Sequence, residues 1–158
     1  MRQIIGLLRV GAGWIFLWAF FDKLLGLGYA TVSEKAWLVG GSPTEGFLSF
    51  ATKGPFKEFF VSLAGNPLVD WLFMLGLLGV GIGLMLGIAV KLSSYSGALM
   101  LVFMYLAGSI WPVHNPFMDE HIMYAIMMFL FPLADNSVIG ISGWWGRQDF
   151  VRKHPILK

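Results

Sequence analysis

The sequence Asn-Pro-Phe-Met-Asp-Glu-His at residues 115–121 opens the last strongly hydrophobic run of the chain, and the other segments can be arranged around it. Asn is a favourable helix N-cap, and proline at the first helical position gives up only an N–H group that has no partner inside the helix. Asp119 and Glu120 then fall in or just after the first turn, where the helix dipole favours carboxylates. The pattern predicts a helix over 116–134 with His121 and the two acids at its entrance.

The composition identifies the broad class of protein. Of the 158 residues, 57% are hydrophobic and only 13% are charged, whereas a soluble domain carries roughly 25% charged residues. The chain is therefore expected to be an integral membrane protein, and its net charge of +2 is too small to suggest a nucleic-acid partner. Because it has no cysteine, disulfides, thiolate nucleophiles and cysteine-ligated metals are excluded.

Four segments are long and apolar enough to be predicted membrane spans. About 20 residues of helix cross a hydrocarbon core of roughly 30 Å. The predicted spans are 4–27, 68–90, 92–111 and 116–134, with a long outer loop over 28–67. The predicted fold class is an all-α integral membrane protein, with a four-transmembrane-helix bundle over 1–134 and a basic tail over 135–158 that contains two adjacent tryptophans.

The long loop carries helix signals of its own. Ser-Pro-Thr-Glu at 42–45 has the form of a capping box, with a serine cap and a glutamate at the third helical position. Apolar residues then recur at i, i+3, i+4 and i+7 in Phe56, Phe59, Phe60 and Leu63. This pattern predicts short amphipathic helices that lie in the membrane interface or cap the bundle. Gly-Gly-Ser at 40–42 either holds an anion through backbone N–H groups or forms a plain turn.

The second predicted span contains two further patterns. It begins with Asn-Pro-x-x-Asp at 66–70, which is repeated at 115–119, so the two helices are either parts of a weak internal repeat or share one capping solution. Gly79, Gly83 and Gly87 are spaced by four residues and predict a small-residue face for close helix approach.

Charge asymmetry predicts the orientation in the membrane. Four spans put both termini on one side, together with Arg2, Lys91 and the basic residues of the tail. The other side has four lysines and seven acidic residues. By the positive-inside rule, both termini are expected in the cytoplasm, the long loop outside and the protein in the cell membrane. Arg9, within the first span, is expected to extend its side chain toward the near interface.

This topology gathers polar residues from all the spans at the outer face. Ionisable residues in membrane segments are rare and indicate a functional site. The candidates are Asp22, Lys23, Asp70, Tyr105, Ser109, His114, Asn115, Asp119, Glu120 and His121. Lys23 is expected to pair with Asp119 or Glu120, because buried charges need partners. His121 is expected to pass protons between the site and the outside, a role for which histidine is the usual side chain. The alternative is that these residues only cap helices and join the first span to the fourth. No spacing motif supports a haem or metal site.

The chain resembles a known family over most of its length, to about Ala134. Gly-Trp at 13–14, Trp-Ala-Phe-Phe-Asp-Lys at 18–23 and Gly-Leu-Gly-Tyr-Ala-Thr at 26–31 are similar to the first helix and loop of DoxX/DoxD-like membrane proteins. The likeness continues in Trp-Leu at 37–38, Gly-Gly-Ser-Pro-Thr at 40–44, Asp-Trp-Leu-Phe-Met-Leu-Gly at 70–76 and the stretch at 115–121.

The resemblance implies a four-helix membrane subunit of a quinone-linked oxidoreductase, with thiosulfate as the expected donor. In this type of enzyme a DoxD subunit works with a second subunit, DoxA, two thiosulfates couple to tetrathionate, and quinone is the electron acceptor. Lys23 would then hold an anion or pair the acids, while Asp22, Asp119, Glu120 and His121 transfer protons. Asp70, Tyr105, His114 and Asn115 are the expected substrate contacts.

Other interpretations of the sequence stay open. The acidic excess on the outer side opposes an anionic substrate, and whether the chain is itself an enzyme is undecided. The alternatives are a non-catalytic membrane scaffold of a redox or oxidative-stress complex and a small solute transporter. The lipid bilayer, quinone and a DoxA-like subunit are the expected partners, and a homo-oligomer is also open.

Overall fold

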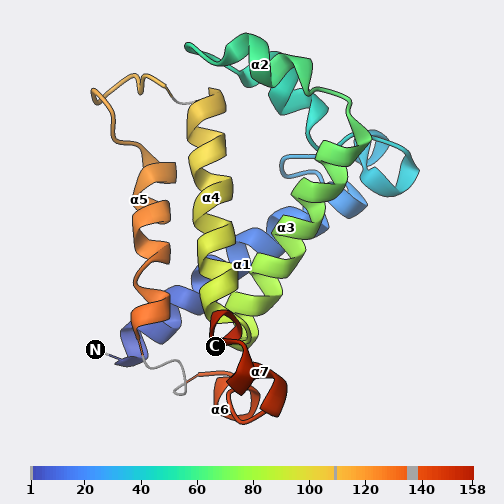
Figure 1. Ribbon diagram of the computed structural model, residues 1–158. Coiled ribbons are helices and arrows are strands. Elements are labelled where there is room, and N and C mark those ends of the chain that lie inside the picture. The colour runs from blue at the N-terminus through green and yellow to red at the C-terminus, as the bar shows by residue number, and fades with distance from the viewer. Residues whose placement is uncertain (1, 109, 135–138) are drawn as a thin grey trace.

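The computed structural model describes residues 2–108, 110–134 and 139–158, and these parts of the chain contain helices and no strand (Figure 1). The three long helices are α1 (Arg2–Leu25), α3 (Pro67–Leu86) and α4 (Val90–Gly108). The shorter elements are η1 (Ser33–Lys35), η2 (Trp37–Val39), η3 (Phe47–Ala51), α2 (Lys57–Ser62), α5 (Glu120–Met128), η4 (Phe131–Leu133), α6 (Ser142–Trp145), α7 (Asp149–Lys153) and η6 (Pro155–Leu157).

The three long helices are long and apolar enough to cross a membrane. They contain 24, 20 and 19 residues, which gives roughly 36, 30 and 28 Å of helix at 1.5 Å per residue. Large apolar side chains such as Leu7, Leu72 and Leu99 stay exposed along them, which is consistent with contact with lipid. The all-helical class is therefore confirmed for the described residues, and each of the first three predicted spans coincides with a helix that could cross a membrane, with ends that differ by a few residues.

The fourth predicted span begins later than its sequence suggests. The side chain of Asp119 accepts a hydrogen bond from the backbone N–H of Ile122 at 3.1 Å and caps α5, which has 9 residues. Asn115 instead accepts from the N–H groups of Phe117 and Met118 and holds a turn. The predicted start at 116 is wrong because this second cap, four residues after the first, is the one the helix uses. With η4 the segment ends at Leu133, shorter than the three long helices.

Helices α1 and α3 make the closest packing through glycines. A Cβ atom on Gly13 would lie 2.7 Å from the backbone nitrogen of Met85, and one on Gly81 would lie 2.8 Å from that of Leu17. The predicted glycine face is confirmed only in part, because Gly83 and Gly87 make close contacts and Gly79 does not. A Cβ on Gly79 would meet nothing within 4 Å, while Gly83 lies against Ser93 of α4. Residues two apart on a helix point about 200° away from each other, so Gly79 and Gly81 cannot serve one interface.

Two alanine substitutions separate these glycines. Gly81→Ala is expected to lower the free energy of unfolding by about 1–3 kcal/mol, because the added methyl overlaps backbone that cannot move independently. Gly79→Ala, two residues away on the exposed side, is expected to be neutral or stabilising by up to about 1 kcal/mol through helix propensity. Thermal unfolding of both variants in one detergent measures the difference. Equal stability of the two would contradict the close α1–α3 contact.

The long loop over 28–67 folds over one end of α3 and of α4. The serine half of the capping box is confirmed, since the backbone N–H of Glu45 donates to the Ser42 hydroxyl at 3.1 Å. Leu48 of η3 and Phe60 of α2 are buried in a small cluster with Ala107 of α4. Figure 1 shows α2 beyond the end of α4. The predicted short helices of the loop therefore form and cap this end of the bundle.

At the opposite end of the bundle, Arg9 connects α1 to the end of α3 and to the tail. Its side chain is 0% exposed and donates to the carbonyls of Leu84, near the end of α3, and Ile139. The expectation that Arg9 reaches the interface is wrong, because the last carbonyls of a helix lack intrahelical donors and carry partial negative charge. The buried guanidinium supplies hydrogen-bond donors to such a carbonyl inside the protein. Residues 135–138 of the predicted tail lie outside the described residues, and 139–158 fold onto this end.

Candidate functional site

The start of α3 places a buried carboxylate against the loop over 28–67. The side chain of Asn66 accepts from the N–H of Leu68 at 2.9 Å and Pro67 takes the first helical position, so Asp70 falls in the first turn. Oδ1 of Asp70 accepts hydrogen bonds from the Ser42 hydroxyl at 2.9 Å, from the Thr44 hydroxyl at 2.6 Å and from the Thr44 N–H at 3.2 Å. One oxygen thus fixes the loop to the helix. Oδ2 receives no hydrogen bond from the described residues.

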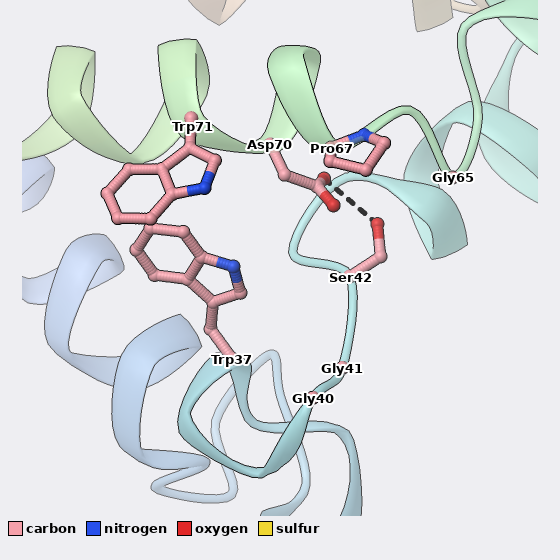
Figure 2. A pocket seen from close by; sticks show the side chains of 8 residues that line it. All are labelled: Trp37, Gly40, Gly41, Ser42, Gly65, Pro67, Asp70 and Trp71. Carbon is pink, nitrogen blue, oxygen red and sulfur yellow. Dashed lines mark hydrogen bonds between the residues drawn. The ribbon is translucent and has the colours of Figure 1, made fainter.

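A pocket of about 280 Å³ opens beside this carboxylate (Figure 2). Its lining residues are Trp37, Gly40, Gly41, Ser42, Gly65, Pro67, Asp70 and Trp71. The rings of Trp37 and Trp71 meet edge to face, with centroids 4.6 Å apart and planes at 72°. Figure 2 shows these two indoles at one side of the site and the Asp70–Ser42 hydrogen bond at the other. The pocket therefore combines aromatic surface with one acidic group.

The N–H groups of Gly40 and Gly41 are not available to an anion. The N–H of Gly40 donates to the Trp37 carbonyl at 3.1 Å, and that of Gly41 donates to the Ala36 carbonyl at 3.0 Å. Both donors are therefore engaged in turns, as the plain-turn alternative predicts. Gly41 is required for another reason, because a Cβ atom there would lie 2.1 Å from the carbonyl oxygen of Lys35.

Asp22 is a second buried carboxylate, and its hydrogen-bond partners are backbone N–H groups. Its two oxygens accept from the N–H groups of Tyr29 at 3.1 Å and Ala30 at 3.0 Å, and so hold the chain that leaves α1. The Trp18 and Tyr29 rings pack edge to face near this loop, with centroids 5.1 Å apart. Lys23 is next in the chain and partly buried.

The acids of residues 119–121 lie elsewhere. Asp119 Oδ2 and His121 Nδ1 are 2.7 Å apart, while Oδ1 caps α5. Glu120 is exposed. No ion pair joins Lys23 to Asp119 or Glu120 among the residues that the structure describes. In Figure 1 the start of α5 and the start of α3 lie on opposite sides of α4. The expected single outer cluster is thus divided into two groups.

Three side chains at the start of α5 are close enough together to hold a metal ion. Asp119, Glu120 and His121 can each offer one ligand atom, and these atoms lie within 4.8 Å of one another. Both Asp119 oxygens and His121 Nδ1 already take part in the contacts described above. A cation would have to replace those bonds, and the group has a sufficient role in capping the helix.

The remaining predicted site residues mainly organise the turn between α4 and α5. The Tyr105 hydroxyl donates to the Phe117 carbonyl at 2.8 Å, and Asn115 forms the turn described above. His114 is exposed, and Ser109 lies outside the described residues. These contacts account for Tyr105 and Asn115 without a ligand.

Sequence reasoning missed the aromatic part of the pocket. Trp37 and Trp71 are 34 positions apart in the sequence, and no periodic pattern links a loop residue to a helix residue. A usable signal was the acid in the first turn of α3 together with the hydroxyl residues of the capping box, because a buried acid there needs donors from another segment. Comparisons of the chain with protein-family models, with curated proteins and with solved structures find no match.

Proposed function

We propose that this chain is the membrane subunit of a quinone-linked oxidoreductase and that the pocket at the start of α3 takes the quinone head group. The observation that carries the proposal is the pairing of Trp37 and Trp71 with Asp70 in one pocket. Aromatic rings favour edge or offset contact with a planar ring. Oδ2 of Asp70, which the described residues leave without a hydrogen bond, is the group that can exchange a proton with a quinone oxygen.

If thiosulfate is the electron donor, it has to be oxidised at a second site, away from the quinone pocket. Reduction of a quinone to a quinol takes two electrons and two protons, and coupling of two thiosulfates to tetrathionate releases two electrons. The pocket is unsuited to thiosulfate, because the Gly40 and Gly41 N–H groups are engaged and a carboxylate faces it. We therefore propose that thiosulfate is oxidised outside this pocket, together with a partner of the DoxA type, the second subunit that the family resemblance implies. Proton transfer by Glu120 and His121 remains a prediction.

The membrane arrangement belongs to the same proposal. Helices α1, α3 and α4 are the first three spans, and α5 with η4 is a shorter fourth that returns the chain to the starting side. The tail supports this, since Ile141 donates to the Leu86 carbonyl at the end of α3, whereas α5 begins after the far end of α4. The basic tail and Arg2 then lie in the cytoplasm and the pocket lies at the outer face of the cell membrane.

A substitution in the pocket tests quinone binding directly. Trp71→Ala is expected to weaken the binding of short-chain ubiquinone or menaquinone analogues about tenfold, because an aromatic contact is worth about 0.5–1.5 kcal/mol beyond its buried area. Titration calorimetry on the purified chain measures this. Trp144→Ala, at the other end of the molecule, is the matched control and should bind as the parent does. Thiosulfate-dependent quinone reduction in proteoliposomes, with candidate partners added, then measures turnover.

A non-catalytic scaffold is the second candidate, and one observation favours it. Asp22, Asp70 and Asp119 all accept hydrogen bonds that hold backbone or hydroxyl groups in place. A scaffold requires only these structural contacts. Absence of quinone binding by a folded parent chain would remove the redox proposal and leave the scaffold.

A further inference from the structure

Residues 139–158 form a small folded unit at the inner ends of α3 and α4 (Figure 1). The N–H of Ile141 donates to the Leu86 carbonyl at 2.8 Å, and the carbonyl of Lys158 accepts from the Lys91 N–H at 2.9 Å. Val151 of α7 is fully buried. The unit is therefore attached at both of its ends to the turn between α3 and α4, and it holds a fixed position relative to the long helices.

The surface of this unit contains large apolar side chains that the described structure leaves about half exposed. They are Ile141, Trp144, Phe150 and Ile156, with exposed fractions of 44%, 54%, 61% and 46%. The two adjacent tryptophans differ. The Trp145 indole donates to the Leu157 carbonyl at 2.6 Å and closes the unit internally, whereas the Trp144 ring is directed to the surface. One tryptophan is thus structural and its neighbour is available to a partner.

The charges of the unit are almost all of one sign. Its exposed basic residues are Arg147, Arg152, Lys153 and Lys158, and Asp149 is its only acid. Basic side chains near a membrane surface attract anionic lipids by about 1 kcal/mol each, and tryptophan favours the headgroup level. The two helices that carry the unit match the roughly 30 Å thickness of a hydrocarbon core. A unit fixed beyond their ends lies at the depth of the headgroups.

We propose that residues 139–158 are a lipid-docking unit that binds anionic phospholipid headgroups. Trp144 and Phe150 enter the boundary between headgroups and acyl chains, and Arg152 and Lys153 lie against phosphates. The inference rests on the membrane arrangement proposed above and is independent of quinone chemistry. An acidic soluble protein would match the charges, but it would not require the unit to lie at headgroup depth.

A single environment-sensitive fluorophore tests the proposal on the full chain. The chain has no cysteine, and a Cβ atom at Gly143 would meet nothing within 4 Å, so Gly143→Cys gives one label next to Trp144. The labelled protein is reconstituted in nanodiscs of phosphatidylcholine alone or with one quarter phosphatidylglycerol. With the anionic lipid, we expect a blue-shifted emission and several-fold protection from acrylamide, a neutral water-soluble quencher.

Two variants identify the groups responsible. Arg152→Gln with Lys153→Gln is expected to remove most of the protection in the anionic bilayer, at about fivefold in partitioning per charge, and 0.5 M salt should weaken it in the parent. Trp144→Ala should reduce the protection without changing the melting temperature, whereas Trp145→Ala should lower that temperature. A label that is equally exposed to acrylamide in both bilayers overturns the proposal and assigns the surface to a protein partner. Protection unaffected by the charge variant also overturns it.

Discussion

Replacing Arg9 with Met is expected to lower the free energy of unfolding by about 2–5 kcal/mol, since each buried carbonyl left without a donor costs about 1–3 kcal/mol. The guanidinium is fully buried and donates to the carbonyls of Leu84 and Ile139. No described carboxylate forms an ion pair with it, so two backbone carbonyls are its partners. Methionine keeps most of the side-chain length and removes all of the donors.

An opposing effect decides how large the loss is. Burial of a charge costs several kcal/mol, and replacing a buried ion by an apolar group is sometimes neutral or stabilising. The loss of the hydrogen bonds to the carbonyls should outweigh the desolvation cost of the charge, because one of these carbonyls lies at the end of α3, where partial negative charge accumulates. Arg9→Lys should fall between the parent and Arg9→Met, since an ammonium group cannot reproduce the planar fork of the guanidinium.

Hydrogen exchange in the contacts of the tail is a second way to measure the effect of replacing Arg9. Hydrogen exchange at the N–H groups of Ile141 and Lys91, which bond to Leu86 and Lys158, should accelerate in Arg9→Met. Arg152→Met, the same change at an exposed position, should leave these amides and the thermal unfolding in detergent unchanged within about 0.5 kcal/mol. An Arg9→Met protein as stable as the parent, with a protected tail, would show that desolvation of the charge outweighs its hydrogen bonds.

Local signals in the sequence predicted the elements well. Hydrophobic length located α1, α3 and α4. The serine cap at residue 42 located the start of the loop helices, and the Asn66 cap located the start of α3. The same reasoning failed at residues 115–119, where two caps compete and the structure uses Asp119. A cap pattern shows that a helix can begin, and contacts elsewhere select the turn in which it does. Here Tyr105 holds the Phe117 carbonyl outside the helix.

Contacts between segments that are distant in the sequence could not be predicted from local signals. The partners of Arg9 lie 75 and 130 positions away, and a polar residue inside a span carries no mark of whether lipid or protein surrounds it. For the candidate site, sequence reasoning named Asp22, Asp70 and Asp119 as important polar residues but placed all of them in one cluster. Helix ends on the same side of a bundle can still be separated by another helix, as α4 separates α5 from α3 in Figure 1.

Asp70 distinguishes a catalytic pocket from a structural one, and two substitutions are expected to behave in opposite ways. Asp70→Ala leaves the hydroxyls of Ser42 and Thr44 and one N–H group without an acceptor in a mostly buried place. Hydrogen bonds to a charged group contribute about 1.5–3 kcal/mol each. The three bonds share one oxygen, so their contributions are not additive, and the loop should detach from α3 at a total cost of about 3–5 kcal/mol. Quinone binding should then be lost with the pocket.

Asp70→Asn retains a carbonyl oxygen that can accept the same bonds as Oδ1, so the fold and the Trp37–Trp71 contact should survive with a loss of about 1 kcal/mol. It removes the ionisable group that faces the pocket. If Asp70 exchanges protons with the quinone, quinone analogues should still bind and turnover with the partner subunit should fall by about 10²–10⁴-fold. Calorimetry on the variant and quinone reduction in proteoliposomes measure the two quantities separately. Full turnover in Asp70→Asn, with an unfolded loop in Asp70→Ala, would make Asp70 a structural residue, because only a structural role depends on its oxygen as an acceptor and not on its proton.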